Sequence, residues 1–476
     1  MERKVFVKKG ILVFLFCAVC ALPFFAEWNS FDIPDSAEAR RQVSREWFEG
    51  TLDTLRGLNS EIRSNQVGTQ FQIRLEEQQD VFLTIVAPKS QMKVDIYEGR
   101  GVRASVEDSY NMDSPGSWLL VRSKKDGSPV SVRYFFAKDA GVYVQFRPNQ
   151  EGRSSLADMV IFDNYAARGV PLGVPFEKFY TASFAEIQTL TKNNLPWSSV
   201  EPKAGLYDDT LVMVQTIRAG LGTIVYEDDA AYNEEGKPVS VRNGQIRYVP
   251  EELRKKLTLS SPGFVKWICD GIVEPLAGSY LKMKPLVQPT FDVNPTGAKA
   301  IMGANYSTSF SLDWTRNLAA AVLSVRNNKT ILYKDSGVDV SIEPFAVRWT
   351  DTGFQNSAGY IENTGYRVQY LKPLLYVLAT RYPQYFYLAA IRQTVRGKNG
   401  NEYSVFNDAA AIFPYFDAEG KFRAVVFYDG LEYSLQQFCA SFDKSQGAFV
   451  HLTRVKATAK FYPQEPAKEK EDDRRN

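Results

Sequence analysis

The chain has 476 residues, of which 44% are hydrophobic and 24% are charged, so it can bury a large core and should form two or three domains. Its net charge is only +2, which gives no electrostatic reason to expect a nucleic-acid partner. The chain contains a single histidine and scattered cysteines, and it lacks a glycine-rich phosphate loop, so we expect neither a metal nor a cofactor.

Residues 1–26 have the pattern of an export signal. A basic start precedes an apolar run from Ile11 to Leu22, which is too short to span a bilayer comfortably, and Ala26 offers a cleavage point. We therefore predict an exported protein of the periplasm or cell envelope. It would contact a membrane only through an uncleaved signal, and lipidation of Cys17 or Cys20 is a further alternative.

The next part of the chain predicts a helical segment followed by a β-rich module. In residues 27–66, apolar side chains recur at helical spacing after Ser36, which predicts a helix to about Leu58. In residues 67–150 the period changes to two, and six short strands separated by turn residues indicate an antiparallel β-sandwich or small barrel. This module would bind a partner or serve as a spacer. Residues 151–205 are expected to be a linker and a loop-rich connection.

Residues 206–462 predict a separate α+β domain. Apolar periodicity alternates between helices, such as residues 310–325, and paired strands, such as residues 422–428. Residues 463–476 are charged and should form a disordered tail. The fold class expected for the whole chain is therefore α+β.

A buried central helix organises this domain. Apolar residues between Phe264 and Ile272 form a wide stripe at helical spacing. Ser261 suits the N-cap, and Pro262 suits the first helical position, where a missing N–H costs nothing. Gly271 and Pro275 should end the helix about three turns later.

The start of this helix, Ser260-Ser261-Pro262-Gly263-Phe264-Val265, resembles the central helix of NlpC-type papain-like cell-wall peptidases, which carry Asp-Cys-Ser-Gly-Phe-Val there. The last three residues match, and Ser261 stands in place of the nucleophilic cysteine. The resemblance implies a papain-like α+β domain. It also implies that the catalytic histidine would fall near Asp408 or Ala409, so that both the thiol and the imidazole are missing.

The candidate catalytic residues are therefore Ser261, Asp408 and His451. A serine hydroxyl ionises far above neutral pH, so Ser261 needs a general base within hydrogen-bond reach, or it is simply a cap. His451 is the only histidine and lies in an apolar strand, where an ordinary structural role is the alternative. Cys269 and Cys439 are expected to be inert buried thiols, with a disulfide between them as the alternative.

Aromatic side chains near the helix suggest a ligand-binding cleft. Trp267, Trp314, Tyr366 and Tyr370 are candidates for stacking on a sugar or peptide, and packing in the core is the alternative. The acidic run at residues 227–229 lacks the spacing of a calcium loop and is expected to be a solvated turn.

The first hypothesis for function is a catalytically degenerate, exported member of the NlpC-type family that binds a peptidoglycan fragment or another envelope protein. The second is an active murein-peptide hydrolase that uses Ser261 with His451 or Asp408. The third is a structural envelope protein with no enzyme ancestry. The hydrolase requires Ser261 to lie within hydrogen-bond reach of one of these partners in an open groove.

Overall fold

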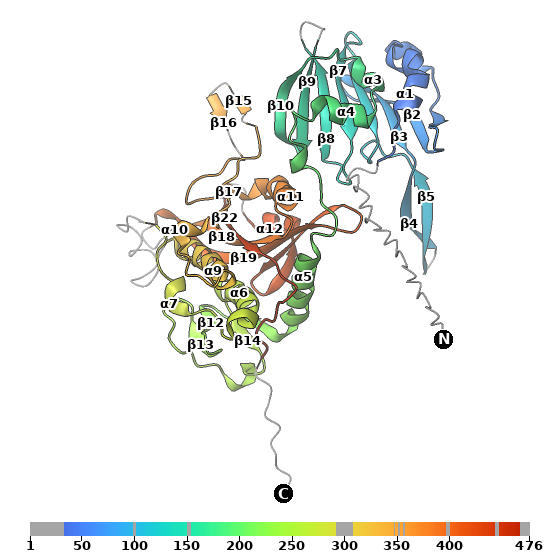
Figure 1. Cartoon of the computed structure of the whole chain (residues 1–476). Helices are drawn as coiled ribbons and strands as arrows, with labels where there is room; N and C mark the ends of the chain where they lie inside the picture. The colour runs from blue at the N-terminus through green and yellow to red at the C-terminus, as the bar shows by residue number, and fades with distance from the viewer. Residues whose placement is uncertain are drawn as a thin grey trace, which may run out of the picture.

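A computed structural model describes residues 33–98, 101–149, 154–291, 308–346, 348–350, 353–355, 358–396, 400–442 and 447–466. In these ranges the chain forms two large antiparallel sheets, one in each half, with helices packed on both (Figure 1). The predicted α+β class is confirmed. The predicted export signal, 1–26, lies outside the described residues, and no helix inside them is both long and apolar enough to cross a bilayer.

The N-terminal sheet contains eight antiparallel strands in the described residues, in the order β1-β2-β3-β6-β7-β8-β9-β10. Residues 155–172, predicted as a loop-rich connection, form two of these strands. The first of them pairs with β8, and its side chains of Ala157, Met159 and Ile161 lie in the core. A separate hairpin, β4-β5, adjoins the sheet. The strands are β1 (Glu61–Ser64), β2 (Gln70–Glu77), β3 (Val81–Pro88), β4 (Ser90–Glu98), β5 (Gly101–Ser109), β6 (Trp118–Ser123), β7 (Pro129–Phe135), β8 (Val142–Pro148), β9 (Ser155–Ile161) and β10 (Asn164–Leu172).

Short helices cover the face of this sheet that a second sheet would cover in a sandwich. The helix predicted from Ser36 to Leu58 is broken at Gly50, where a Cβ atom would lie 2.6 Å from the carbonyl oxygen of Glu46, and Thr51 caps a new helix. Trp118 anchors the layer, because its Nε1 donates a hydrogen bond to the carbonyl oxygen of Phe179 (3.0 Å). The helices are α1 (Ala37–Val43), the π-helix η1 (Ser44–Phe48), α2 (Leu52–Arg56), α3 (Lys178–Thr181), α4 (Phe184–Thr191) and the 3-10 turn η2 (Trp197–Ser199).

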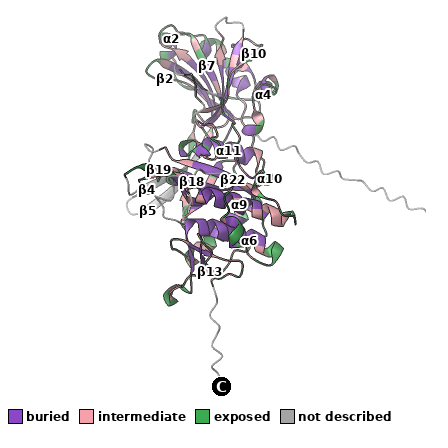
Figure 2. Ribbon diagram, turned by 90° about the vertical axis from the view of Figure 1, so that its left-hand side faces the viewer, coloured by how far each residue is buried: buried purple, intermediate pink, exposed green. Residues whose placement is uncertain are grey.

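The two halves share one hydrophobic core where they meet. Helix α11 (Leu371–Arg381) lies between the sheets with nearly all of its residues buried (Figure 2). Thr380 Oγ1 donates a hydrogen bond to Ser199 O (3.0 Å), and the N–H of Phe422 donates one to Asp139 Oδ2 (2.9 Å). The N-terminal half is therefore packed against the C-terminal half, because apolar contacts continue across the junction.

The C-terminal sheet has the strand order β17-β22-β18-β19-β20-β21 in the described residues. One face packs on α6 and α9, and the other packs on α11 and α12. The strands of this half are β11 (Ile224–Tyr226), β12 (Ala230–Tyr232), β13 (Pro238–Ser240), β14 (Leu257–Leu259), β15 (Arg348–Thr350), β16 (Gly353–Gln355), β17 (Tyr366–Arg367), β18 (Tyr385–Arg396), β19 (Glu402–Phe416), β20 (Phe422–Tyr428), β21 (Leu431–Ser434) and β22 (Phe449–Lys456). Its helices are α5 (Asp208–Gly220), η3 (Leu221–Thr223), η4 (Glu251–Leu253), α6 (Ser261–Ala277), α7 (Met283–Leu286), α9 (Phe310–Arg326), α10 (Tyr333–Ser336), η5 (Val368–Tyr370), α11 and α12 (Leu435–Ala440).

The central helix α6 is longer than the sequence predicts. Gly271 and Pro275 were expected to end it, yet both lie inside it. A Cβ atom at Gly271 would lie 2.7 Å from the ring of Phe461, so the glycine lets the C-terminal segment cross the helix closely. The helix ends at Gly278, whose left-handed φ of 67° suits a glycine C-cap.

Candidate functional site

The N-terminus of α6 presents two serines with different roles. Ser260 is the N-cap, because its Oγ accepts a hydrogen bond from the N–H of Gly263 (3.3 Å) and donates one to the carbonyl oxygen of Ala230 (3.1 Å). Ser261 is the first helical residue, so the predicted N-cap role belongs to its neighbour. Gly263 is required here, since a Cβ atom would lie 1.9 Å from Ala230 O. The hydroxyl of Ser261 is therefore available for a contact outside the helix.

The structure brings Ser261 and Asp408 together. Ser261 Oγ donates a hydrogen bond to Asp408 Oδ1 on β19, over 3.0 Å, and this bond joins the tip of α6 to the sheet beneath it. Strand β19 is irregular at this point, because its pairing with β18 shifts register between Asp408 and Phe406, which leaves Asn407 as an extra residue. Asp408 is also the position near which the family resemblance would place a histidine.

A second carboxyl, that of Asp429, lies beside Asp408. Asp429 follows β20 in a turn with left-handed backbone (φ 51°). The hydroxyls of Ser261 and Tyr428 lie beside the two carboxyls, and that of Ser261 donates its hydrogen bond to Asp408. Burial raises the pKa of Asp408, and these hydroxyls partly oppose that shift. Burial and the nearby charge of Asp408 raise the pKa of Asp429 to about 6. The two carboxyls therefore resist simultaneous ionisation in mildly acidic solution.

These groups adjoin a pocket of about 360 Å³, referred to below as the Ser261 pocket. Arg242 supplies the positive charge of its lining, with guanidinium nitrogens 3.6 Å from a carboxylate oxygen of Asp228 and 3.6 Å from one of Asp229. The lining therefore contains three carboxylates and one guanidinium, and the excess negative charge suits an amine-bearing ligand. The lining residues are Tyr226, Asp228, Asp229, Val241, Arg242, Ser260, Ser261, Pro262, Phe310, Asn407 and Asp408.

The helix tip supplies few donors for a developing oxyanion. Pro262 has no N–H, and the N–H of Gly263 is occupied by Ser260 Oγ (3.3 Å). Loss of a single oxyanion donor slows acyl transfer by about 100- to 1,000-fold in well-studied enzymes. A carboxylate such as Asp408 also has a far lower proton affinity than a serine alkoxide. The geometry therefore favours hydrogen bonding to a ligand over nucleophilic attack by Ser261.

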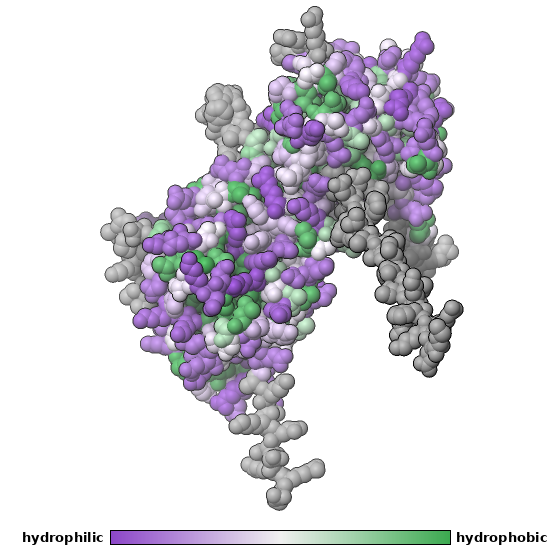
Figure 3. Space-filling view, viewed as in Figure 1, coloured by the Kyte–Doolittle hydropathy of each residue, from purple (hydrophilic) through white to green (hydrophobic). Residues whose placement is uncertain are grey.

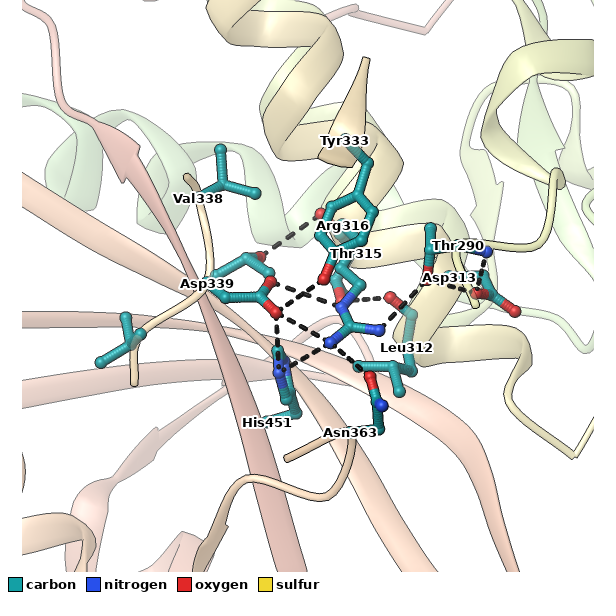
Figure 4. Close-up of polar contacts among 12 residues, drawn as sticks. Thr290, Leu312, Asp313, Thr315, Arg316, Tyr333, Val338, Asp339, Asn363 and His451 are labelled. Atoms are coloured by element: carbon teal, nitrogen blue, oxygen red, sulfur yellow. Dashed lines mark hydrogen bonds and ion pairs between the residues drawn. The ribbon is translucent and has the colours of Figure 1, made fainter. Parts of the chain in front are cut away.

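His451 belongs to a different polar cluster, which is buried between α9 and β22 (Figure 4). Its Nε2 lies 3.3 Å from Asp339 Oδ2 and 3.3 Å from the hydroxyl of Tyr360. Burial lowers the pKa of His451, although the adjacent carboxylate of Asp339 opposes the shift. The histidine is fully buried, and its polar contacts in the described residues do not include Ser261. The structure thus separates this candidate from the serine.

Arg316 is the centre of that buried cluster. One guanidinium nitrogen, Nη2, donates hydrogen bonds to Asp339 Oδ2 (2.8 Å) and to Asn363 Oδ1 (2.9 Å). The hydroxyl of Tyr333 also donates a hydrogen bond to Asp339 Oδ2 (2.8 Å). Burial alone would raise the pKa of Asp339, but His451 and Arg316 lower it to about 2. These charges neutralise one another, so the cluster holds α9 against the sheet.

The aromatic residues predicted to bind a ligand lie mainly in the core. Trp267, Trp314 and Tyr366 are buried, and each donates a hydrogen bond to a backbone carbonyl oxygen, over 2.9, 2.9 and 2.8 Å respectively. Tyr370 is partly buried against the core between the sheets. None of the four lines the Ser261 pocket. Trp267, Trp314 and Tyr366 therefore pack in the core, which was the alternative to ligand binding.

No local sequence pattern distinguishes Tyr226, Arg242, Tyr428 and Asp429 from ordinary strand and turn residues, so the sequence does not predict them as site residues. The solvated turn predicted at residues 227–229 is present, with Asp228 exposed, and the carboxylates of Asp228 and Asp229 also line the Ser261 pocket.

Neither Cys269 nor Cys439 lines the Ser261 pocket. Cys269 and Cys439 are unpaired, and burial raises the pKa of Cys439 to about 11. Across the described ranges, no group of three or more His, Cys, Asp or Glu side chains is arranged to hold a metal ion.

The N-terminal half of the chain is similar to a known protein family. A domain of unknown function (DUF8515) matches residues 29–199, the part that contains the eight-stranded sheet and its covering helices. No curated protein and no solved structure matches the chain. The Ser261 pocket therefore lies outside the matched region.

Proposed function

We propose that this chain is an exported cell-envelope protein whose C-terminal domain is a catalytically degenerate relative of the NlpC-type papain-like peptidases. In this proposal the Ser261 pocket binds a murein peptide. The hydrogen bond from Ser261 Oγ to Asp408 Oδ1 (3.0 Å) carries the proposal, because a hydroxyl and a carboxylate stand where the family would have a thiol and an imidazole. A helix whose N-terminus meets an antiparallel sheet also supports a papain-like domain.

The chemistry of the pocket supports binding more than catalysis. Asp408 accepts a hydrogen bond from the hydroxyl of Ser261. Transfer of the proton itself from a hydroxyl to a carboxylate is strongly uphill in free energy. Pro262 removes one backbone donor from the helix tip. With a weak base and few oxyanion donors, bound ligand should leave the site unchanged.

Carboxylates define the ligand that the pocket would accept. Asp228, Asp229 and Asp408 face the space, and Arg242 balances only part of their charge. A peptide amino group in this space would gain charge-assisted hydrogen bonds, which are stronger than neutral ones. Murein peptides offer such amino groups, and so does a basic segment of an envelope protein.

Calorimetry with purified chain and murein peptides tests the proposal, with mass spectrometry of the same mixtures to detect cleavage. We expect binding without cleavage. The Asp408→Asn variant should bind about 10- to 100-fold more weakly, because a charged hydrogen-bonding partner is lost. Glu419→Gln, an exposed change in the turn between β19 and β20, is the matched control and should bind normally.

Two outcomes would contradict the murein proposal. If no murein peptide binds to the wild type, a protein partner replaces murein as the ligand. If binding is equal in Asp408→Asn and the control, the Ser261 pocket is not the binding site.

The second candidate is a hydrolase in which Asp408 accepts the proton of Ser261. Their 3.0 Å hydrogen bond favours it, because this is the contact that such a reaction needs. Cleavage that disappears in Ser261→Ala, with binding retained, would establish the hydrolase and overturn the degenerate assignment.

A further inference from the structure

An apolar groove lies on the C-terminal half between α7, α9 and α10, separate in its lining from the Ser261 pocket. Figure 3 shows hydrophobic side chains gathered over α9 and bordered by hydrophilic ones. The groove has a volume of about 920 Å³, and the small side chains of Ala320 and Ala321 form its floor. Leu276 and Leu332 flank it, and they are 54% and 58% exposed. Large apolar side chains at the edges of the groove are therefore exposed to solvent.

Hydrogen bonds hold both walls of the groove to its floor. Asn317 Nδ2 on α9 donates to the carbonyl oxygens of Leu286 (3.0 Å) and Gln288 (2.7 Å), which fixes the wall that contains α7. Ser324 Oγ accepts a hydrogen bond from the N–H of Ile331 (2.9 Å) and donates one to its carbonyl oxygen (3.0 Å), which fixes the opposite wall. A ligand would therefore enter a preformed shape and lose little affinity to reorganisation.

The charged side chains that line the groove are all lysines. Lys282, Lys329 and Lys334 line it and are exposed, and no carboxylate lines it within the described residues. No ion pair engages any of the three in the part of the chain that the structure describes. An occupant should therefore combine an apolar body with a negative charge.

We propose that this groove binds a single-chain anionic amphiphile, a long-chain fatty-acid carboxylate. The chain would lie on the alanine floor, where it needs no hydrogen bonds, and the carboxylate would lie among the lysines. An acidic peptide helix fits less well: a helix with side chains is about 10 Å wide and rises 5.4 Å per turn, so the groove would hold about two turns. So short a helix is only marginally stable. The inference does not depend on the proposed function.

Equilibrium dialysis of the purified full chain with radiolabelled decanoate, dodecanoate and tetradecanoate tests the inference, at concentrations below micelle formation. Each added methylene should tighten binding by about three- to fourfold, because it moves one more apolar group out of water. Dodecyltrimethylammonium, with an equal chain and a positive head, should bind more weakly than dodecanoate. Failure of dodecanoate to bind, or equal binding of the two surfactants, would overturn the proposal.

Two variants locate the binding to the groove. Ala321→Trp should abolish dodecanoate binding by filling the floor, and its thermal unfolding shows whether the fold is retained. Replacing Lys282, Lys329 and Lys334 together with Gln should weaken binding about tenfold at low salt and reduce its salt dependence. The matched control replaces three exposed lysines outside the groove, Lys192, Lys203 and Lys421, and should bind normally. Unchanged binding in folded Ala321→Trp, or an equal loss in the control, would contradict the proposal.

Discussion

The Ser261 pocket and the Arg316–Asp339–His451 cluster are both polar sites on the same sheet and helix layer, yet their electrostatics are opposite. Carboxyls crowd together at the pocket, and beside it the pKa of Asp429 rises to about 6. In the cluster, a guanidinium and an imidazole surround one carboxylate, and the pKa of Asp339 falls to about 2. An unbalanced, accessible group of charges can bind a ligand, whereas a balanced and buried one holds the fold together. The lone histidine belongs to the second kind.

The comparison is tested most strongly by removing the centre of the buried cluster. Arg316→Met should lower the free energy of unfolding by about 3–5 kcal/mol, because Asp339 then remains largely buried without its main counter-charge. Urea denaturation measures the change. The matched control is Arg218→Met, which breaks the exposed pair with Glu432 and should cost about 1 kcal/mol or less. Equal effects in the two variants would show that Arg316 has no special structural role.

A histidine with a structural role should affect stability and leave ligand binding unchanged. His451→Ala should reduce the free energy of unfolding by about 1.5–3 kcal/mol, the range for a hydrogen bond to a charged partner. Binding of murein peptide to the folded fraction should be unaffected, which calorimetry below the unfolding temperature measures. Loss of binding or of any cleavage without a loss of stability would place His451 in the functional site.

The two serines at the helix tip allow a finer comparison. Ser260→Ala should cost about 1 kcal/mol of stability through loss of the N-cap bond and should leave ligand affinity nearly unchanged. Ser261→Ala should have a similar effect on stability through loss of its bond to Asp408, but it should also change ligand affinity. Chemical denaturation and calorimetry on both variants check this. If Ser260→Ala changes affinity more than Ser261→Ala, the assigned roles are reversed.

The two sites should also differ in the pH dependence of the stability that they contribute. Asp429 has a raised pKa, so the stability it contributes is present below its unfolded pKa of about 4 and is lost as the pH rises through about 6. Asp339 has a depressed pKa, so its contribution is present above about 4 and is lost as the pH falls through about 2. Thermal melts from pH 3 to 8 should therefore show that Asp429→Asn gains stability relative to wild type between pH 4 and 6. An unchanged difference across this window would contradict the raised pKa.

The sequence predicted the α+β class and the buried central helix. It also predicted that Ser261 would contact either Asp408 or His451, and the structure shows the contact with Asp408. Those predictions depended on local periodicity and on one short resemblance. The helix start was misplaced by one residue, because two adjacent serines both satisfy N-cap preferences. The helix end was misplaced because the glycine at 271 serves a crossing segment that only the fold brings near.

The rest of the site could not be predicted, because its members meet only through the topology. Asp408 lies in β19, whereas Asp429 follows β20. Arg242 comes from a loop that precedes α6. The aromatic residues failed as site predictions for a related reason: composition does not tell a core tryptophan, such as Trp314, from one in a cleft.

Ser261 acts, in the proposed function, as a hydrogen-bond donor to Asp408 and not as an activated nucleophile. The most direct measurement is mass spectrometry of the protein after treatment with an excess of a fluorophosphonate, a reagent that labels activated serines, from pH 5 to 8. We expect Ser261 to remain unmodified, and wild type and Ser261→Ala to give the same labelling. A stoichiometric adduct on Ser261 that is absent from the folded Asp408→Asn variant would contradict it.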